Sequence, residues 1–203
     1  PVRMSCMLGS SPRPFTMSDR RSAVLVELGR ARVAFRDVSR GTDPRTVIAC
    51  LVPPGVFLTN KAPYLTFVNG DETTQAACLG IMNSLPFDWQ ARRFVEINVN
   101  FFILEGLVFP QLSDEDFHIV ARNAARLSAV DDRFADFAGA TGVEVGPLED
   151  AERQRLLVEI DARVARSWSL TPAELAFIFD DFTTDAVSEH YRADLLARFG
   201  ELI

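Results

Sequence analysis

The pattern of hydrophobic and polar positions changes period along the chain. From residue 23 to residue 68, short apolar runs, some of them alternating with polar positions, are separated by Gly, Pro and Asn, which is typical of strands. The predicted strands lie at 23–28, 32–38, 46–52, 56–58 and 64–68. A later apolar run, opened by two asparagines and closed by Pro110, predicts another strand at 101–109. Residues 1–22 are polar and irregular and predict a flexible lead-in.

The other segments have the hydrophobic periodicity of helices. Residues 72–84 predict a helix, and Pro86 suits the first turn of a second helix that runs to about residue 95. One face of this second helix is apolar and consists of Phe87, Ala91, Phe94 and Val95. After residue 110 the chain is predicted to be helical to its end, with a loop at 139–146. Helices are predicted there at 113–130, 149–168 and 173–182. The first starts with a capping-type sequence, and the capping box Thr171-Pro-Ala-Glu174 starts the third.

These patterns together predict an α+β fold. We expect a small mixed β-sheet with flanking helices in residues 23–110, followed by an all-α region in residues 111–203. The same two parts of the chain also differ in net charge. Residues 1–110 hold 12 basic and 9 acidic residues, whereas residues 111–203 hold 9 and 19. A surface that binds an anion is therefore expected in the first part, and the second part is expected to be a solvated acidic unit.

Composition narrows the possible compartment. No apolar run approaches the roughly 18 residues of a membrane span, and the start of the chain lacks the pattern of a signal peptide. The three cysteines, Cys6, Cys50 and Cys78, are far apart and mostly in apolar surroundings, so we expect buried free thiols and a reducing compartment. The sequence thus predicts a cytoplasmic protein without a membrane partner.

The chain lacks the motifs of the common catalytic centres. It has neither of the Gly-rich phosphate-binding loops and no Cys or His cluster with metal-ligand spacing, because His118 and His190 are solitary. Pro53-Pro54 lacks the flanking residues of an adenine methyltransferase catalytic loop, and Lys61, the only lysine, is not preceded by the acidic residue of a common nuclease centre. We therefore predict no catalytic residues, no metal ligands and no cofactor in this chain.

Several segments, in this order and spacing, resemble a known family. They are Phe35-Arg-Asp-Val38, Thr42-Asp-Pro-Arg-Thr46, Ile48-Ala49, Leu51-Val-Pro-Pro54, Leu58-Thr-Asn-Lys-Ala-Pro-Tyr64, residues 79–93, Asn98-Val-Asn-Phe-Phe-Ile103 and Phe109-Pro110. They look like the target recognition domain of bacterial N6-adenine DNA methyltransferases, namely type IIG restriction–modification enzymes and related phage-defence methyltransferases. Residues 160–179 are similar to the helical tail of such proteins.

The resemblance implies a role in sequence-specific recognition of double-stranded DNA. Enzymes of this kind carry an upstream methyltransferase domain or subunit that binds S-adenosylmethionine, and some carry a nuclease. Neither has a counterpart in this chain, so the resemblance implies a recognition module without catalytic activity of its own.

Reading a DNA sequence requires side chains that bond base edges, while other side chains bond phosphates. The candidate DNA-binding residues are Arg36, Arg40, Arg45, Asn60, Lys61, Arg92, Arg93, Asn98 and Asn100. Each also has a structural alternative. Arg36 could pair with Asp37 or Asp43, Arg92 and Arg93 could lie on an ordinary solvated helix face, and the asparagines could serve turns and strand entries. Trp89, Phe94, Phe101 and Phe102 are expected in the core rather than stacked on bases.

A different class of function stays open. The chain could be a non-catalytic protein–protein interaction module of a multi-subunit assembly, with the acidic helices docked on a partner. Clustering of Arg36, Arg40, Lys61, Arg92 and Arg93 on one face would favour DNA, and dispersal would favour the interaction module. A standalone enzyme is the least favoured class.

Overall fold

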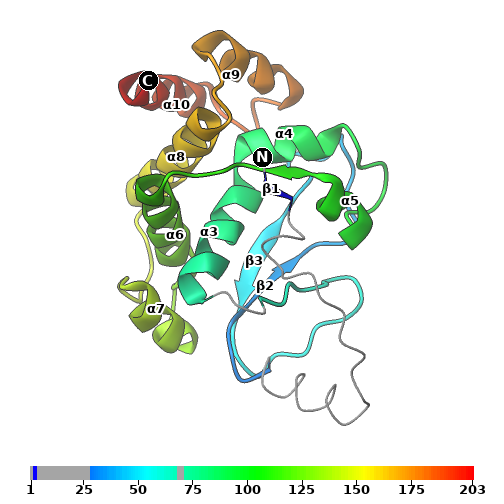
Figure 1. Cartoon of the computed structure of the whole chain (residues 1–203), viewed down its shortest axis with the longest axis vertical. Coiled ribbons are helices and arrows are strands. Elements are labelled where there is room, and N and C mark those ends of the chain that lie inside the picture. The colour runs from blue at the N-terminus through cyan, green and yellow to red at the C-terminus, as the bar shows by residue number, and fades with distance from the viewer. Residues whose placement is uncertain (1, 4–27, 68–70) are drawn as a thin grey trace.

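The chain folds into a small β-structure that packs against a set of helices. The computed structural model describes residues 2–3, 28–67 and 71–203 (Figure 1). This arrangement confirms the predicted α+β class. The strand β2 (Arg32–Phe35) pairs antiparallel with β3 (Ala49–Val52), with Arg32 opposite Val52. The two-residue strands β1 (Val2–Arg3) and β4 (Val108–Phe109) also pair antiparallel.

Helices make up most of the remaining structure. Those before residue 111 are α3 (Glu72–Asn83), α4 (Leu85–Arg92) and α5 (Phe101–Gly106). Those after it are α6 (Asp114–Ser128), α7 (Ala135–Thr141), α8 (Asp150–Ser167), α9 (Pro172–Ile178) and α10 (Glu189–Leu202), with 3₁₀ turns at Asp132–Phe134 and Phe179–Asp181. The caps act as predicted, because Ser113 accepts a bond from the N–H of Asp116 and Thr171 forms a capping box with Glu174.

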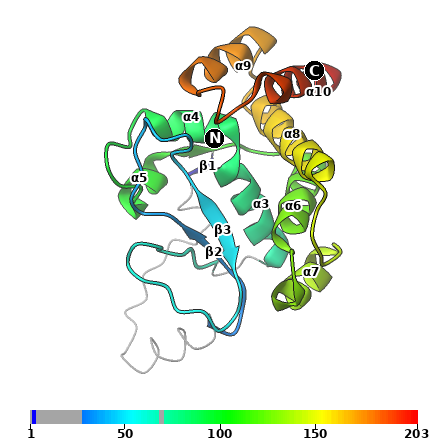
Figure 2. The ribbon, with the colours of Figure 1, turned by 180° about the vertical axis from the view of Figure 1, so that it is seen from behind.

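One hydrophobic core extends on both sides of residue 110. Helix α3 lies between the β2–β3 pair and α6, and both faces of it are buried (Figures 1 and 2). Gly80 lets α3 and α6 approach closely, since a Cβ atom there would lie 2.8 Å from Cγ1 of Val120. Residues 28–110 and 111–203 therefore share their largest core, although their charges differ.

A second, smaller core joins α4 to the end of the chain. Leu85 and half-buried Trp89 of α4 pack with residues of α8, α9 and α10, including Ala162, Leu175 and Phe199. The three last helices form one end of the molecule (Figure 2). The second core thereby fixes α4, and the loop after it, against the acidic region.

The predicted strand at 101–109 is wrong. Residues 101–106 form the helix α5, and only Val108 and Phe109 are extended. The side chain of Asn100 explains the difference, because it accepts a hydrogen bond from the N–H of Ile103 at 3.0 Å and so caps a helix. A short apolar run is compatible with a buried helix as well as with a strand.

Four other element predictions differ from the structure. Residues 56–58 form no strand, and of 64–67 only Tyr64 makes an isolated bridge, to Ala34. The predicted loop at 139–146 begins late, because α7 continues to Thr141 and ends at Gly142, whose φ of 68° suits glycine. The predicted helix at 173–182 ends in a 3₁₀ turn. The predicted lead-in at 1–22 and strand at 23–28 lie almost entirely outside the described residues.

Two expectations about burial are also wrong. Phe94 is 60% exposed, Phe101 is 43% exposed and Phe102 is 85% exposed, so these rings are not in the core. Phe94 follows the end of α4, so helical spacing no longer places it on the apolar face. Cys78 is a buried free thiol as expected, whereas Cys50 is a free but exposed one.

Candidate functional site

Three segments that carry predicted site residues meet beyond the end of β2. The N–H of Asp37 donates to the carbonyl of Lys61 at 3.0 Å, and the carbonyl of Asp37 accepts from the N–H of Val99 at 2.6 Å. Val38 and Asn98 form an antiparallel bridge. The segment 36–45 therefore lies beside both the turn at 59–62 and the segment 97–100. We call the surface formed by these three segments and the end of α4 the loop face.

The antiparallel register sets which side chains are neighbours on the loop face. With Val38 opposite Asn98, Arg36 lies level with Asn100 and Arg40 lies level with Glu96. Lys61 is joined to the same place, because its Nζ is 3.0 Å from Oδ2 of Asp37. Tertiary structure thus gathers Arg36, Lys61, Asn98 and Asn100, although up to 64 residues separate them in the sequence.

Carboxylates within the protein neutralise part of this positive charge. Arg36 pairs with Asp43 at 2.8 Å, which is one of the two partners considered for it, and Lys61 pairs with Asp37. The side chains of Arg36 and Lys61 are 44% and 60% exposed, so water screens both pairs. Pairs of this kind are weak and can exchange one anion for another.

Arg40 and Arg93 border a hollow beside the end of α4. Its volume is about 350 Å³, and Gly41, Glu96 and Asp181 also line it. Arg93 pairs with Asp181 and lies over the ring of Trp89, with 5.1 Å between its Cζ and the ring centroid. No carboxylate in the described part of the chain pairs with the guanidinium of Arg40, which makes it the most available cation of the loop face.

The side chain of Arg92 is buried and bonds other groups of the protein. It is only 6% exposed and donates to the carbonyls of Gly41, Asp43 and Pro44 at 2.6–2.8 Å. It also pairs with Asp88 at 3.2 Å and lies over the ring of Phe182. The alternative of a solvated helix face is therefore wrong for Arg92, which ties the 41–44 turn to α4.

The side chain of Arg45 also bonds other groups of the protein. It donates to the carbonyl of Asn83 and lies 3.5 Å from Asp88. Asp88 is fully buried and also accepts from the N–H groups of Thr46 and Val47, at 2.8 Å and 2.5 Å. The sequence pattern placed Asp88 away from the apolar face of α4. Nothing in that pattern indicated that this carboxylate anchors the loop face.

The three candidate asparagines differ in what they offer. Asn60 is exposed in a turn that the N–H of Ala62 closes on the carbonyl of Thr59 at 3.0 Å. Asn98 is half-buried, and Asn100 is exposed but uses its Oδ1 to cap α5. Of the three, only Asn100 therefore has a side-chain hydrogen bond within the described residues.

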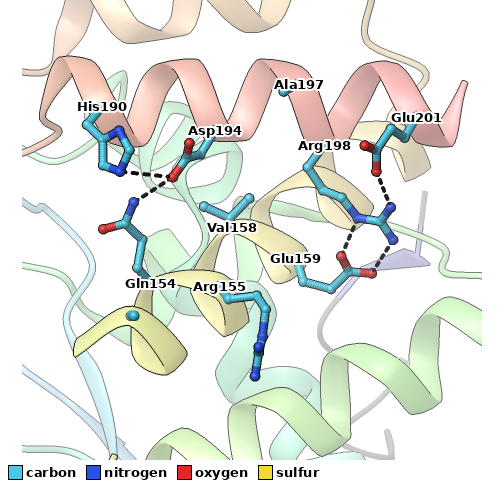
Figure 3. Close-up of a pocket in the computed structure, with 10 residues that line it drawn as sticks. Gln154, Arg155, Val158, Glu159, His190, Asp194, Ala197, Arg198 and Glu201 are labelled. Atoms are coloured by element: carbon cyan, nitrogen blue, oxygen red, sulfur yellow. Dashed lines mark hydrogen bonds and ion pairs between the residues drawn. The ribbon is translucent and has the colours of Figure 1, made fainter. Parts of the chain in front are cut away.

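A separate hollow of about 600 Å³ lies between α8 and α10 (Figure 3). In it Gln154 donates to Asp194 at 2.6 Å, and Arg198 bridges Glu159 and Glu201. These polar groups form hydrogen bonds and ion pairs with one another, most of them between the two helices. The hollow therefore offers no evident set of groups for a reaction.

Buried carboxylates hold the acidic region together. Burial alone would raise the pKa of Asp116, but hydrogen bonds from Arg166 and Arg163 outweigh it and lower that pKa. Burial raises the pKa of Asp161 from 3.8 to about 6, although Tyr191 and the N–H of Leu85 both donate to this carboxylate. Asp161 thus carries a perturbed proton equilibrium at a helix junction, away from the loop face.

Two kinds of feature are not found among the described residues, and the comparisons add no relative. In residues 2–3, 28–67 and 71–203, no three His, Cys, Asp or Glu side chains gather as a metal site would require. No helix of these ranges combines the length and apolar character needed to cross a membrane. Comparison of the chain with protein-family models, curated proteins and solved structures found no match.

Proposed function

We propose that the chain is the sequence-specific double-stranded DNA recognition module of a bacterial restriction–modification type N6-adenine DNA methyltransferase. The observation that carries this proposal is that the segments 36–45, 59–62 and 97–100 lie side by side on the loop face. All three segments contain candidate DNA-binding residues. Side chains that can bond phosphates lie there beside amides that can bond bases. The family resemblance of the sequence supports the same conclusion.

The residues of the loop face divide into two roles under this proposal. Arg36, Arg40, Lys61 and Arg93 contact phosphates, and Asn60 and Asn98 bond base edges. Arg45 and Arg92 hold the loop in shape, and Asn100 caps α5. DNA phosphates replace Asp43, Asp37 and Asp181 as partners of the cations, which costs little because exposed ion pairs contribute at most about 1 kcal/mol each.

The acidic helical region has a supporting role. Its charge repels the duplex, so DNA lies against the loop face and away from α8–α10. Methyl transfer belongs to the upstream methyltransferase domain or subunit of the parent enzyme, which would supply the S-adenosylmethionine site. This chain contributes no catalytic residue, cofactor or metal ligand to that reaction.

The proposal can be tested by the binding of the full chain to fluorescently labelled duplexes of random sequence. We expect weak binding at about 50 mM salt that is lost towards about 200 mM, because phosphate contacts release counterions. Arg40→Ala combined with Arg93→Ala should weaken binding and reduce the salt slope by about two. Arg155→Ala, at an exposed position of α8, is the matched control and should change neither. Binding without salt dependence, or an equal loss in the control, would contradict the proposal.

A second candidate is a non-catalytic protein–protein interaction module. Intramolecular pairing of Arg36, Lys61 and Arg93 favours it, because these cations already have anionic partners. Absence of duplex binding in the same titration, down to about 50 mM salt, would favour this candidate over DNA recognition.

A further inference from the structure

The β2–β3 pair has two outer edges, at which backbone groups point away from the partner strand. On the edge of β2, the N–H of Phe35 donates to the carbonyl of Pro63 at 3.0 Å. The N–H of Leu65 donates to the carbonyl of Val33 at 2.8 Å. The segment 63–65 therefore closes this edge, whereas the outer edge of β3 lies on the side of α3 (Figure 2).

Asn83 of α3 closes only part of the edge of β3. Its side-chain amide bonds both backbone groups of Ala49, since Oδ1 accepts from the N–H at 3.0 Å and Nδ2 donates to the carbonyl at 3.0 Å. The register points the N–H and C=O of Leu51 to the same edge, because alternate residues of a strand share a direction. Within residues 2–3, 28–67 and 71–203, no group bonds Leu51 on that edge.

A hollow of about 500 Å³ adjoins this open position. Leu51 and Asn83 line it, together with residues of α6, α8 and the 3₁₀ turn at Asp132–Phe134. Its larger apolar lining residues are Leu79, Leu127, Phe134, Leu157 and Ile160. Buried backbone groups in folded proteins nearly always have a partner, so the N–H and C=O of Leu51 require one from within the hollow.

Charged side chains also line the hollow. Arg133 pairs with Asp131 at 2.7 Å, and Asp161 is buried and accepts hydrogen bonds from two groups of the protein. Arg153 is exposed, and no carboxylate of the described residues pairs with its guanidinium. Arg153 is therefore the lining residue that can bind an added carboxylate.

We propose that the hollow binds an extended, acidic peptide segment of a partner protein, which adds to β3 at Leu51 as a short third strand. One residue of the segment bonds the N–H and C=O of Leu51, next to the place that the amide of Asn83 occupies. Apolar side chains of the segment pack on the leucines of the hollow, and a carboxylate pairs with Arg153. The inference does not rest on the proposed function, because no residue of the loop face lines the hollow.

A polypeptide fits this combination of groups better than other ligands do. Its backbone offers a donor and an acceptor to one residue of a strand, as the amide of Asn83 does to Ala49. A lipid chain would cover the leucines but leave the N–H and C=O of Leu51 unpaired, which is costly. A nucleic acid would bring phosphates to a mostly apolar lining that already contains the carboxylate of Asp161.

Amide hydrogen exchange, followed by nuclear magnetic resonance on the full chain, tests the open edge directly. In the free chain the Leu51 amide should exchange faster than the amides of Cys50 and Val52, because only Leu51 lies in the unpaired position. The probe is a short peptide of alternating valine and threonine that ends in aspartate. At about ten times its Kd, this peptide should slow exchange of the Leu51 amide about tenfold.

Backbone methylation of the probe tests strand pairing. Alternate N–H groups of a strand point to opposite edges. Two versions of the probe therefore carry N-methyl groups on one or the other set of alternate residues. One version should lose binding, because its donors face Leu51, and the other should keep it.

Charge reversal tests the place of the carboxylate. Arg153→Glu should weaken binding of the probe by about 5- to 30-fold, because it replaces an exposed attraction by a repulsion. The matched control is Arg155→Glu, which is exposed on the same helix and outside the lining. Neither variant should change the thermal stability of the chain.

Four results would overturn the proposal. Slow exchange of the Leu51 amide in the free chain would mean that the edge is already paired. No binding of the probe, or binding that leaves this exchange unchanged, would exclude strand addition. Equal loss in both methylated versions would exclude it as well. A dimer that Arg153→Glu dissociates would make a second copy of the chain, and not a partner protein, the occupant.

Discussion

Asp88 and Arg92 illustrate how a few buried polar residues can shape a surface. The Asp88 carboxylate accepts from two backbone N–H groups and pairs with two arginines. Arg92 in turn bonds three carbonyls of the 41–44 turn. A buried charge of this kind is tolerated only with all of these partners in place. The shape of the loop face therefore depends on buried residues beneath it.

The first prediction compares two adjacent arginines. Arg92→Ala should lower the free energy of unfolding by about 3–5 kcal/mol, because it leaves the buried Asp88 undercompensated and three carbonyls without their donor. Arg93→Ala should lower it by at most about 1 kcal/mol, because the pair with Asp181 is half exposed. Urea unfolding of both variants measures the difference. Equal effects would mean that Arg92 has no special structural role.

The second prediction concerns Asp161. Its folded pKa of about 6 exceeds its ordinary value of 3.8, so the folded chain holds this proton more tightly than the unfolded chain does. The contribution of this group to stability is complete only below its ordinary pKa of 3.8 and is lost as the pH rises through 6, by about 3 kcal/mol in all.

Asp161→Asn should remove this pH dependence. Its amide can still accept from the N–H of Leu85 and bond the Tyr191 hydroxyl, without a buried charge. Relative to the wild-type chain, the variant should therefore gain stability as the pH rises from 4 to 6. Thermal unfolding across this range checks it, with Asp185→Asn at an exposed position as the control. A difference that does not change with pH would refute the prediction.

At the scale of the elements, the contact between α3 and α6 matters most. Both helices contribute small residues where they cross, and Gly80 of α3 faces Val120 and Ala124 of α6. Close approach of two helices at small side chains gives dense packing over a large area. Residues 28–110 and the acidic region are held together at this crossing.

The third prediction uses two helical glycines. Intrinsic propensity favours alanine over glycine by about 1 kcal/mol, and Gly139→Ala in α7, with no atom near the added Cβ, should gain up to this amount. Gly80→Ala should instead lose about 1–3 kcal/mol, because its Cβ would overlap buried Val120. Denaturant midpoints measure both changes. Adding Val120→Ala to Gly80→Ala should improve packing at the crossing, and stabilisation by Gly80→Ala alone would contradict the contact.

At the scale of the whole molecule, packing and charge divide the chain differently. Charge changes sign near residue 110, whereas the first hydrophobic core contains residues from β2, α3, α6 and α8. The second core adds α4 to the last helices. Two regions with different surface charge thus share their interior.

The fourth prediction follows from the shared core. The full chain should unfold in one cooperative transition, with coincident midpoints by far-ultraviolet circular dichroism and by tryptophan fluorescence. The two tryptophans report on different cores, because Trp89 packs with the second and Trp168 with the first. Separate transitions would mean that residues 23–110 and 111–203 fold independently.

Local signals in the sequence determined the α+β class and most of the helices. Caps such as those at Ser113 and Thr171 act within a few residues, so the sequence displays them directly. The strands β2 and β3 followed from alternating and β-branched runs, whereas their antiparallel pairing was seen only in the structure. The apolar run at 101–109 was compatible with a strand and with a helix. In the structure Asn100 caps a helix at 101–106.

Only the tertiary structure decided which predicted site residues are available. The sequence shows that Arg36, Arg45, Arg92 and Arg93 are charged, but not which carboxylates or carbonyls lie within reach. Asp88 reaches Arg45, and Asp181 reaches Arg93, through contacts between distant segments. The fold likewise leaves Phe102 outside the core, at 85% exposure. Burial and ion pairing depend on these long-range neighbours, so residue type and spacing alone do not reveal them.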